Sequence, residues 1–309
     1  MRLRPAILVL RGGAVGDFIL TLPALQALRR HWPEASIELA GYPGIAELAR
    51  LGGLVDTVVS LHQARIAGLY ALHGPLDRNL HAFLSPFDRI VAYLHDPDGS
   101  VMRNLRESGV RKIIHLSPVD PPVHAADYFL SSLAGEGVLE PGPAVPRLKL
   151  QEAVRSAGRA RLERWGITKA ALVLHPGSGS PCKNWPLVRF LELADLHLAA
   201  GNPVIFLLGE ADALIAAEVR LFCSARACPL MENEPLTEVA SLLAGCGSYV
   251  GNDSGLTHLA AALGLRTLAL FGPTDPALWS PRGDQVRILQ GAGGKMDTLS
   301  VDAVFSALQ

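Results

Sequence analysis

The stretch "SYVGNDSGLTHLAAALGLRTLALFG", Ser248–Gly272, decides the fold class. Its first residues, "SYVG", form a short apolar run typical of a buried strand, and "TLALFG" forms a second one. Between them, "LTHLAAALG" has the pattern of a helix that a glycine ends. A strand, a helix and a second strand in succession predict parallel strands joined by a crossover helix. We therefore expect a parallel sheet that helices cover on both faces.

The same alternation runs through the chain in two series. In the first series we expect strands in "AILVLR", "SIELA", "DTVVSL", "RIVAYL" and "RKIIHL". The Pro- and Gly-rich segment "EPGPAVPRLKL", residues 140–150, separates this series from the second. We therefore predict two doubly wound, Rossmann-like α/β domains that face a cleft, over residues 1–150 and 151–309. A last helix over about residues 299–309 could pack back on the N-terminal domain. Ligands of such sheets bind at the carboxyl ends of the strands.

Composition excludes several classes of protein. Because 49% of the 309 residues are hydrophobic and 18% are charged, we expect large hydrophobic cores. The net charge of −1 disfavours a positive electrostatic field that would attract nucleic acid. The four cysteines include no C-x-x-C pair, which disfavours a zinc site or a disulfide framework. The apolar runs are too short for a signal peptide or a membrane span. We expect a cytoplasmic protein without a metal site, and peripheral contact with a membrane stays open.

The loop "RGGAVGDF" follows the first predicted strand. Its glycines, Gly12, Gly13 and Gly16, permit a tight turn and close approach of a ligand to the backbone. A dinucleotide-binding G-x-G-x-x-G would need glycine where Arg11 stands, which disfavours an NAD-dependent enzyme. Asp17 opens the following helix, either as a capping carboxylate or as a general base. The loop alone favours capping.

The loop "HPGSGSPCKNWP", His175–Pro186, joins a strand to a helix in the second series. Ser178, Gly179 and Ser180 offer backbone N–H groups and hydroxyls to an anion, and Lys183 adds a positive charge. A Walker loop would need glycine in place of cysteine before this lysine. Phosphate binding and a Ser/Gly turn with a surface lysine remain the two alternatives.

The third loop lies within the opening stretch. Asn252, Asp253 or Ser254 can cap the helix, but capping needs only one of them. With Gly255, exposed amides at this helix start would bind phosphate, and His258 in the first turn is a candidate ligand of the same group. Two anion loops in the second domain suggest a diphosphate. A candidate base in the first domain suggests chemistry between the domains.

Three segments together resemble the heptosyltransferases of glycosyltransferase family nine. They are "ILVLRGGAVGDFILTLPALQALRRHWP", "LVLHPGSGSPCKNWP" and "VGNDSGLTHLAAALGLRTLALFGPTDP", and the resemblance runs from about Ile7 to Pro281. It implies the two-domain GT-B fold. It also implies transfer of heptose from ADP-heptose to the growing lipopolysaccharide inner core, with inversion, without a metal in the chemical step and with no cofactor besides the donor substrate.

The resemblance also assigns roles to residues. It places the general base on Asp17, and a ligand of the donor phosphate or sugar on Lys183. It implies that Glu210 reaches the ribose of the nucleotide. The remaining donor-binding positions are Ser178, Gly179, Asp253, Ser254, Gly255 and His258.

The acceptor and the alternatives stay open at this point. The resemblance implies a lipid-linked or oligosaccharide acceptor and no nucleic acid, and it leaves peripheral contact with the inner membrane open. Candidate cations for an acidic acceptor are Arg65, Arg78, Arg103, Arg106, Arg111 and Lys112. One alternative is another nucleotide-sugar enzyme of the same plan, either an epimerase or a natural-product glycosyltransferase. A second is a non-catalytic sugar-nucleotide binding protein, which would not need Asp17.

Overall fold

The structure is a computed structural model that describes residues 4–138 and 140–308. The chain divides into two compact units. The first comprises the residues up to Ala14 together with Leu20–Ala144, and the second comprises Val15–Ile19 and the residues from Val145 onward. Each unit holds one parallel sheet, which confirms the predicted fold class.

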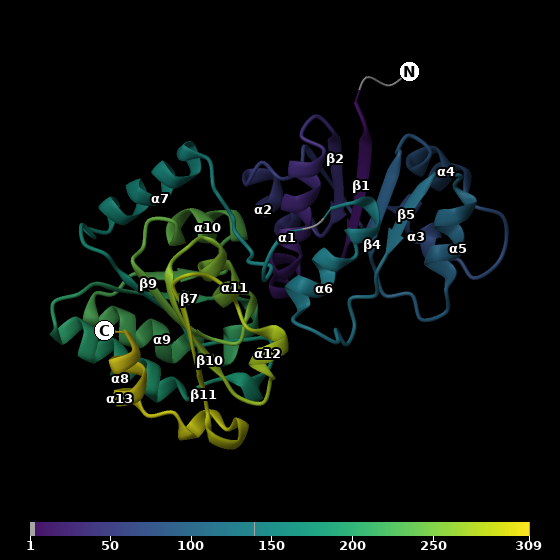
Figure 1. Cartoon of the computed structure of the whole chain (residues 1–309). Helices are drawn as coiled ribbons and strands as arrows, with labels where there is room; N and C mark the ends of the chain where they lie inside the picture. The colour runs from purple at the N-terminus through teal and green to yellow at the C-terminus, as the bar shows by residue number, and fades with distance from the viewer. Residues whose placement is uncertain (1–3, 139, 309) are drawn as a thin grey trace. The chain divides into compact units, whose positions relative to one another are not determined.

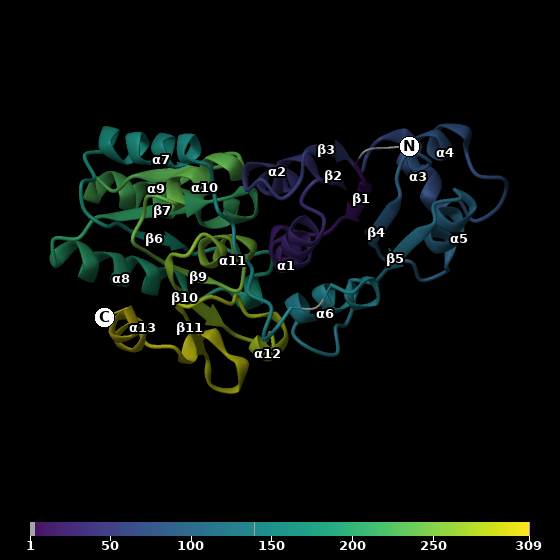
Figure 2. The same ribbon diagram turned by 45° about the horizontal axis from the view of Figure 1, so that its top comes forward.

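The first unit is built on a five-stranded parallel sheet in the order β3-β2-β1-β4-β5, and all five strands are labelled in the second of two views (Figures 1 and 2). All five strands were expected from the sequence. They are β1 (Ala6–Arg11), β2 (Ser36–Gly41), β3 (Thr57–Ser60), β4 (Arg89–Tyr93) and β5 (Lys112–His115). The central strand β1 is buried from Ile7 to Arg11, because neighbouring strands flank it and helices cover both faces.

Helices connect these strands. They are α1 (Val15–His31), α2 (Pro43–Leu51), α3 (Ala64–Ala67), α4 (Arg78–Leu84), α5 (Ser100–Glu107) and α6 (Ala125–Ser131), with the 3-10 turns η1 (Gly68–Tyr70) and η2 (Ala134–Glu136). The sequence predicts a kink or a restart at Pro23, but α1 runs as one helix past this residue. The segment "DPD", residues 96–98, forms a turn before α5. The carboxylate of Asp96 accepts from the amides of Val101 and Met102 and so caps α5.

The second unit is built on a six-stranded parallel sheet in the order β11-β10-β9-β6-β7-β8. Its strands are β6 (Leu172–His175), β7 (Val204–Leu208), β8 (Leu230–Glu232), β9 (Ser248–Asn252), β10 (Arg266–Phe271) and β11 (Val286–Gln290). The stretch Ser248–Gly272 forms β9, α11 and β10, as expected. Sequence patterns missed β8 and β11. Both are edge strands, and neither carries the continuous apolar run that marks the strands inside the sheet.

Helices cover both faces of this second sheet. They are α7 (Glu152–Arg164), α8 (Leu187–Ala199), α9 (Ala213–Arg226), α10 (Leu236–Leu243), α11 (Gly255–Ala262), α12 (Pro276–Trp279) and α13 (Val301–Leu308). The 3-10 turns are η3 (Pro181–Lys183), η4 (Glu210–Asp212), η5 (Ala292–Gly294) and η6 (Met296–Thr298). Helix α7 packs along α10, as two views show (Figures 1 and 2).

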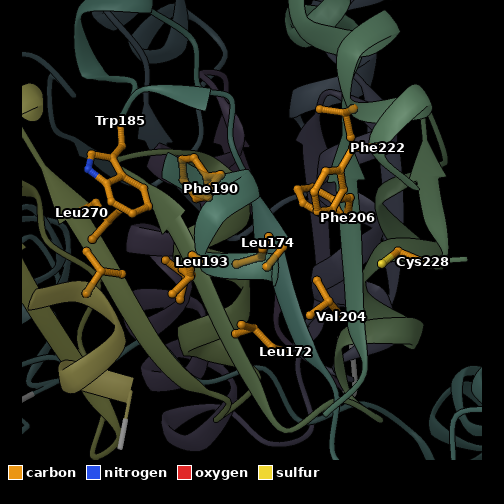
Figure 3. Close-up of a cluster of buried hydrophobic side chains, with 14 of the residues drawn as sticks. Leu172, Leu174, Trp185, Phe190, Leu193, Val204, Phe206, Phe222, Cys228 and Leu270 are labelled. Atoms are coloured by element: carbon orange, nitrogen blue, oxygen red, sulfur yellow. The ribbon is translucent and has the colours of Figure 1, made fainter. Parts of the chain in front are cut away.

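One face of the second sheet carries a large apolar core under α8, α9 and α13. Figure 3 shows part of it, with Trp185 and Phe190 at one end and Phe206 and Phe222 at the other. Val250 of β9 points into this core, whereas its neighbour Tyr249 points to the opposite face, where its hydroxyl lies 3.4 Å from Thr257 of α11.

The last helix packs within the second unit. Val304 and Leu308 of α13 are buried in the apolar core described above, and α13 contacts α8. The sequence led us to allow for packing on the N-terminal domain instead. Trp185 Nε1 donates to the carbonyl of Leu299 at 2.9 Å and so fixes the segment that leads into α13. The apolar side chains of α13 therefore pack against the second sheet.

Candidate active site

Three polar loops meet at one edge of the second sheet. The first polar loop, residues 176–186, follows β6; the second, residues 209–212, follows β7; and the third, residues 253–255, follows β9. Because β9, β6 and β7 are neighbours in a parallel sheet, their carboxyl ends lie side by side. This is the edge at which ligands bind in doubly wound sheets.

An ion pair joins the first and third polar loops. Lys183 Nζ lies 2.7 Å from Asp253 Oδ2, and 32% of the lysine side chain is exposed against 8% of the aspartate. The carboxylate therefore holds the ammonium group beside the start of α11. Both side chains were predicted to bind the same ligand, and the structure brings them together.

The start of α11 is an uncapped helix N-terminus. Ser254 occupies the N-cap position with an extended backbone, but its side chain makes no capping hydrogen bond. Within residues 4–138 and 140–308, the amides of Gly255 and Leu256 meet no hydrogen-bond acceptor. Open amides and the positive end of the helix dipole favour an anion here. The expectation that a side chain of this segment caps the helix is wrong for Ser254.

The first polar loop is organised by its own side chains. Ser178 Oγ lies 2.6 Å from Asn184 Oδ1 and 2.8 Å from the carbonyl oxygen of Ser180. The backbone amide of Ser180 donates to Ser178 Oγ at 3.2 Å. The Ser178 hydroxyl is thus occupied inside the loop, and this residue would reach an anion through its backbone. Gly179 is exposed at the tip of the loop.

Asn252 fastens the first polar loop to the end of β9. Its Oδ1 accepts from the amide of Trp185 at 2.9 Å, and its Nδ2 donates to the carbonyl of Pro176 at 2.7 Å. The side chain is fully buried. Its sequence position makes Asn252 a possible helix cap, whereas in the structure its side-chain amide fixes both ends of a loop that lies far from it in the chain.

A buried pair behind the loops was not predicted. His175 ends β6 and Asp212 ends η4, and His175 Nε2 lies 3.2 Å from Asp212 Oδ2. The same carboxylate oxygen accepts from the amide of Gly209 at 2.7 Å. Burial alone would raise the pKa of the Asp212 carboxyl, but the hydrogen bonds to His175 and Gly209 and the attraction to His175 bring this pKa below its usual value. The signal in the sequence was that His175 ends one predicted strand and Asp212 follows the next one.

The other predicted donor residues lie at the same edge. Glu210 opens η4 and is exposed, and no hydrogen bond or ion pair of its side chain occurs in the described part of the chain. His258 is buried in the first turn of α11. Their roles toward a nucleotide sugar stay predictions.

Asp17 lies in the first turn of α1 and is partly exposed. The preceding loop contains Gly12, Gly13 and Gly16, and Gly13 has a φ of 96°, which favours glycine. Arg11, where a dinucleotide motif would need glycine, is 2% exposed, and its Nε donates to Thr21 Oγ1 at 2.9 Å. Arg11 therefore has a structural role at the carboxyl end of β1. The role of Asp17 as a base stays a prediction.

The cysteines differ sharply in exposure. Cys182 is exposed in the first polar loop, next to Lys183. Burial raises the pKa of the Cys223 and Cys246 thiols to about 12. Burial also raises the pKa of the Cys228 thiol. Cys223 and Cys228 are buried and Cys246 is half-buried, so Cys182 is the exposed cysteine of the four, and it stands at the candidate site.

Neither a metal-binding cluster nor a membrane-spanning helix occurs within residues 4–138 and 140–308. In this part of the chain, histidine, cysteine, aspartate and glutamate side chains do not gather in a group of three or more that could hold a metal ion. None of the helices described in this part is both long enough and apolar enough to span a membrane.

Comparison with known proteins decides the family. The profile of glycosyltransferase family 9 (heptosyltransferase) matches residues 134–307. The lipooligosaccharide heptosyltransferase 2 of Haemophilus ducreyi is 34% identical over 315 residues, which cover 92% of this chain and 88% of that protein. The chain belongs to glycosyltransferase family 9.

Further comparisons agree with this family 9 assignment. A shorter match, 32% identical over 124 residues, covers 38% of this chain and 35% of the lipooligosaccharide heptosyltransferase 2 of Haemophilus influenzae. The solved structure of the Escherichia coli ADP-heptose lipopolysaccharide heptosyltransferase II superposes with a TM-score of 0.79 at 20% identity, covering 98% of this chain and 97% of that one. The resemblance and the two-domain GT-B fold expected from the sequence are confirmed.

Proposed function

We propose that this family 9 protein is an inverting glycosyltransferase that moves a heptose from ADP-heptose to a lipopolysaccharide inner-core or related acceptor. The observation that carries the proposal is the meeting of an uncapped α11 N-terminus with Lys183 at the three polar loops. The similar heptosyltransferases support the choice of sugar and acceptor class.

The donor diphosphate would bind in the second unit. The amides of Gly255 and Leu256 would donate to its oxygens, and Lys183 would add a mobile positive charge. Negative charge grows on the diphosphate as the bond to the sugar breaks, and fixed N–H groups stabilise this charge without rearranging. Glu210 is free to reach the ribose, whereas His258 and Asp253 would face the sugar and its phosphates.

Asp17 would act as the general base. The acceptor hydroxyl is a poor nucleophile near neutral pH, so its proton must leave as the attack proceeds. Inversion brings the acceptor to the sugar face opposite the leaving diphosphate, which calls for a carboxylate that is not part of the three polar loops. Asp17 meets this condition, because it follows β1 in the first sheet.

The acceptor would meet cations of the first unit. Four of the six candidates are already engaged: Arg65 stacks over Phe83, Arg103 donates to the carbonyl of Ala71, Arg111 pairs with Asp88, and Lys112 pairs with Glu136. Arg78 and Arg106 are exposed and make no such contact within the described residues. We expect these two arginines to contact an acidic, lipid-linked or oligosaccharide acceptor at the cytoplasmic face of the inner membrane.

A donor screen tests the proposal. The purified protein is incubated with ADP-heptose, ADP-mannose and UDP-sugars, each with and without inner-core acceptors, and the products are identified by mass spectrometry. Heptose transfer that depends on the acceptor is the expected result. An altered sugar nucleotide without acceptor would show an epimerase instead, and binding without any product would show a non-catalytic protein.

Replacing Lys183 with alanine is expected to weaken ADP-heptose binding by about 1.5–3 kcal/mol, the range for a charge-assisted hydrogen bond. Removing the ammonium group also leaves the Asp253 carboxylate without its partner at 2.7 Å, which adds repulsion toward the diphosphate. Isothermal titration calorimetry measures the effect. Lys169→Ala, at an exposed lysine outside the three loops, serves as the control. An unchanged affinity of Lys183→Ala would remove this residue from the site.

Turnover is expected to survive chelation. The reason is that the α11 amides and Lys183 can neutralise the leaving diphosphate, which is the task a divalent ion performs in metal-dependent transferases. The assay compares initial rates in excess EDTA and in added Mg²⁺ or Mn²⁺. A complete loss of activity in EDTA that either ion restores would contradict the proposal.

A further inference from the structure

A chain of buried hydrogen bonds connects the second polar loop to the start of α11. Asp212 Oδ2 lies 3.2 Å from His175 Nε2, and His175 Nδ1 lies 3.3 Å from Ser254 Oγ. His175 and Asp212 are 5% and 4% exposed. The imidazole therefore has one partner on each ring nitrogen, and these partners come from loops that follow two different strands.

The partners fix the orientation of the ring and the place of the hydroxyl. The Asp212 carboxylate accepts a hydrogen bond from His175 Nε2–H, which sets the orientation of the imidazole. Nδ1 then lies against Ser254 Oγ, and the hydrogen bond between these two atoms holds the hydroxyl in place. The carboxylate at one end of the chain thereby fixes the position of the hydroxyl at the other end.

This arrangement turns Ser254 away from its own helix. A serine at the N-cap, with the extended backbone that Ser254 has, ordinarily accepts from the amide of the second or third helical residue. Here the Ser254 hydroxyl instead lies against His175 and, at 3.1 Å, against Thr257 Oγ1. Thr257 Oγ1 lies 2.5 Å from the carbonyl of Asn252, which commits its own hydrogen. The amide of Leu256 consequently stays open.

Asp212 is fixed in turn by its surroundings. It accepts from the amide of Gly209, and a Cβ placed on Gly177 would lie 1.4 Å from its Oδ1. Glycine at position 177 is thus required for the carboxylate to occupy its place beneath the first polar loop. The carboxylate is therefore packed against the backbone of that loop.

We infer that His175 and Asp212 are positioning residues, which hold the Ser254 hydroxyl off the start of α11 and so keep the Leu256 amide available to the donor diphosphate. The inference rests on the proposed donor site, but it makes a claim about the donor-free protein that can be tested separately. It also means that Ser254 serves the donor through its backbone, while its hydroxyl belongs to the supporting chain.

Two substitutions of His175 separate this role from general packing. The side-chain amide of asparagine lies near the position of Nδ1, so His175→Asn can keep the bond to Ser254. The amide of glutamine lies near the position of Nε2, so His175→Gln can keep the bond to Asp212 but loses the bond to Ser254. A residue that only fills space would respond alike to both changes.

The first measurement is the exchange rate of the Leu256 amide with water, followed by NMR in the donor-free protein. We expect fast exchange in the wild type and in His175→Asn, slow exchange in His175→Gln, and fast exchange again in His175→Gln/Ser254→Ala. Fast exchange in His175→Gln, or slow exchange in the wild type, would overturn the inference whether or not the protein binds ADP-heptose.

The second measurement is ADP affinity by calorimetry. His175→Gln is expected to weaken ADP binding about tenfold, the equivalent of one N-cap hydrogen bond, and His175→Asn much less. In the Ser254→Ala background the effect of His175→Gln should vanish. Equal losses in His175→Asn and His175→Gln, or an equal loss with and without the Ser254 hydroxyl, would contradict the positioning role. If the wild type binds no ADP, the proposed function fails, and the exchange rates alone decide the inference.

Discussion

Asp17→Asn is expected to lower turnover by about 10²–10⁴-fold while leaving donor affinity nearly unchanged, because it removes a general base and keeps the shape of the side chain. This loss corresponds to roughly 3–5 kcal/mol of activation free energy. Asparagine is as good a helix cap as aspartate, so the first turn of α1 should persist. Single-turnover rates with ADP-heptose and an inner-core acceptor measure the chemical step directly.

A matched substitution distinguishes a base from a cap. Asp77 caps α4, where its Oδ1 accepts from the amides of Asn79 and Leu80, and no chemistry is proposed for it. Asp77→Asn should therefore leave turnover near that of the wild type. If Asp17→Asn behaved in the same way, Asp17 would be a capping residue. If Asp17→Asn unfolded the protein, a structural role would explain the loss of turnover better than catalysis.

Trp185→Ala is expected to destabilise the second unit by about 3–5 kcal/mol, the usual cost of truncating a large aromatic side chain in a core. Trp185 is 1% exposed, and its ring packs edge-on to Phe190 with centroids 4.9 Å apart. The change also removes the hydrogen bond from Nε1 to the carbonyl of Leu299. Equilibrium unfolding in guanidinium chloride measures the difference in free energy.

The same change should disturb the candidate site. The backbone amide of Trp185 holds the side chain of Asn252, which fastens the first polar loop. A looser loop would weaken ADP binding in the folded variant. Leu214→Ala is the control, since this leucine is 95% exposed and its loss should change stability by less than about 0.5 kcal/mol. A similar stability of both variants would show that Trp185 does not anchor the core.

Local patterns predicted most of the fold. The strands inside each sheet are continuous apolar runs, since helices cover both of their faces, and all of those in the first unit were found. The edge strands β8 and β11 were not predicted, because an edge strand lacks a neighbour on one side and its sequence need not be uniformly apolar. The order of the strands depends on contacts between distant segments, which periodicity does not report.

The candidate site was predicted only in part for the same reason. Lys183 and Asp253 were found because each lies in a loop whose composition suggests an anion. The direction of the Ser254 hydroxyl was not predictable, because His175 lies 79 residues away in the chain and only the fold brings the two together. Asn252 was misread as a cap because its hydrogen-bond partners are likewise distant.

The exposure of Cys182 gives the protein a built-in attachment point for a reporter. Cys223 and Cys228 are buried, Cys246 is half-buried, and burial raises the pKa of all three thiols, so a maleimide dye at neutral pH should react fastest at Cys182. That position adjoins Lys183 in the first polar loop. The rate of dye attachment therefore reports how often a ligand covers the loop. Measuring this rate at increasing concentrations of each nucleotide sugar would rank the donors without an acceptor and without a substitution in the chain.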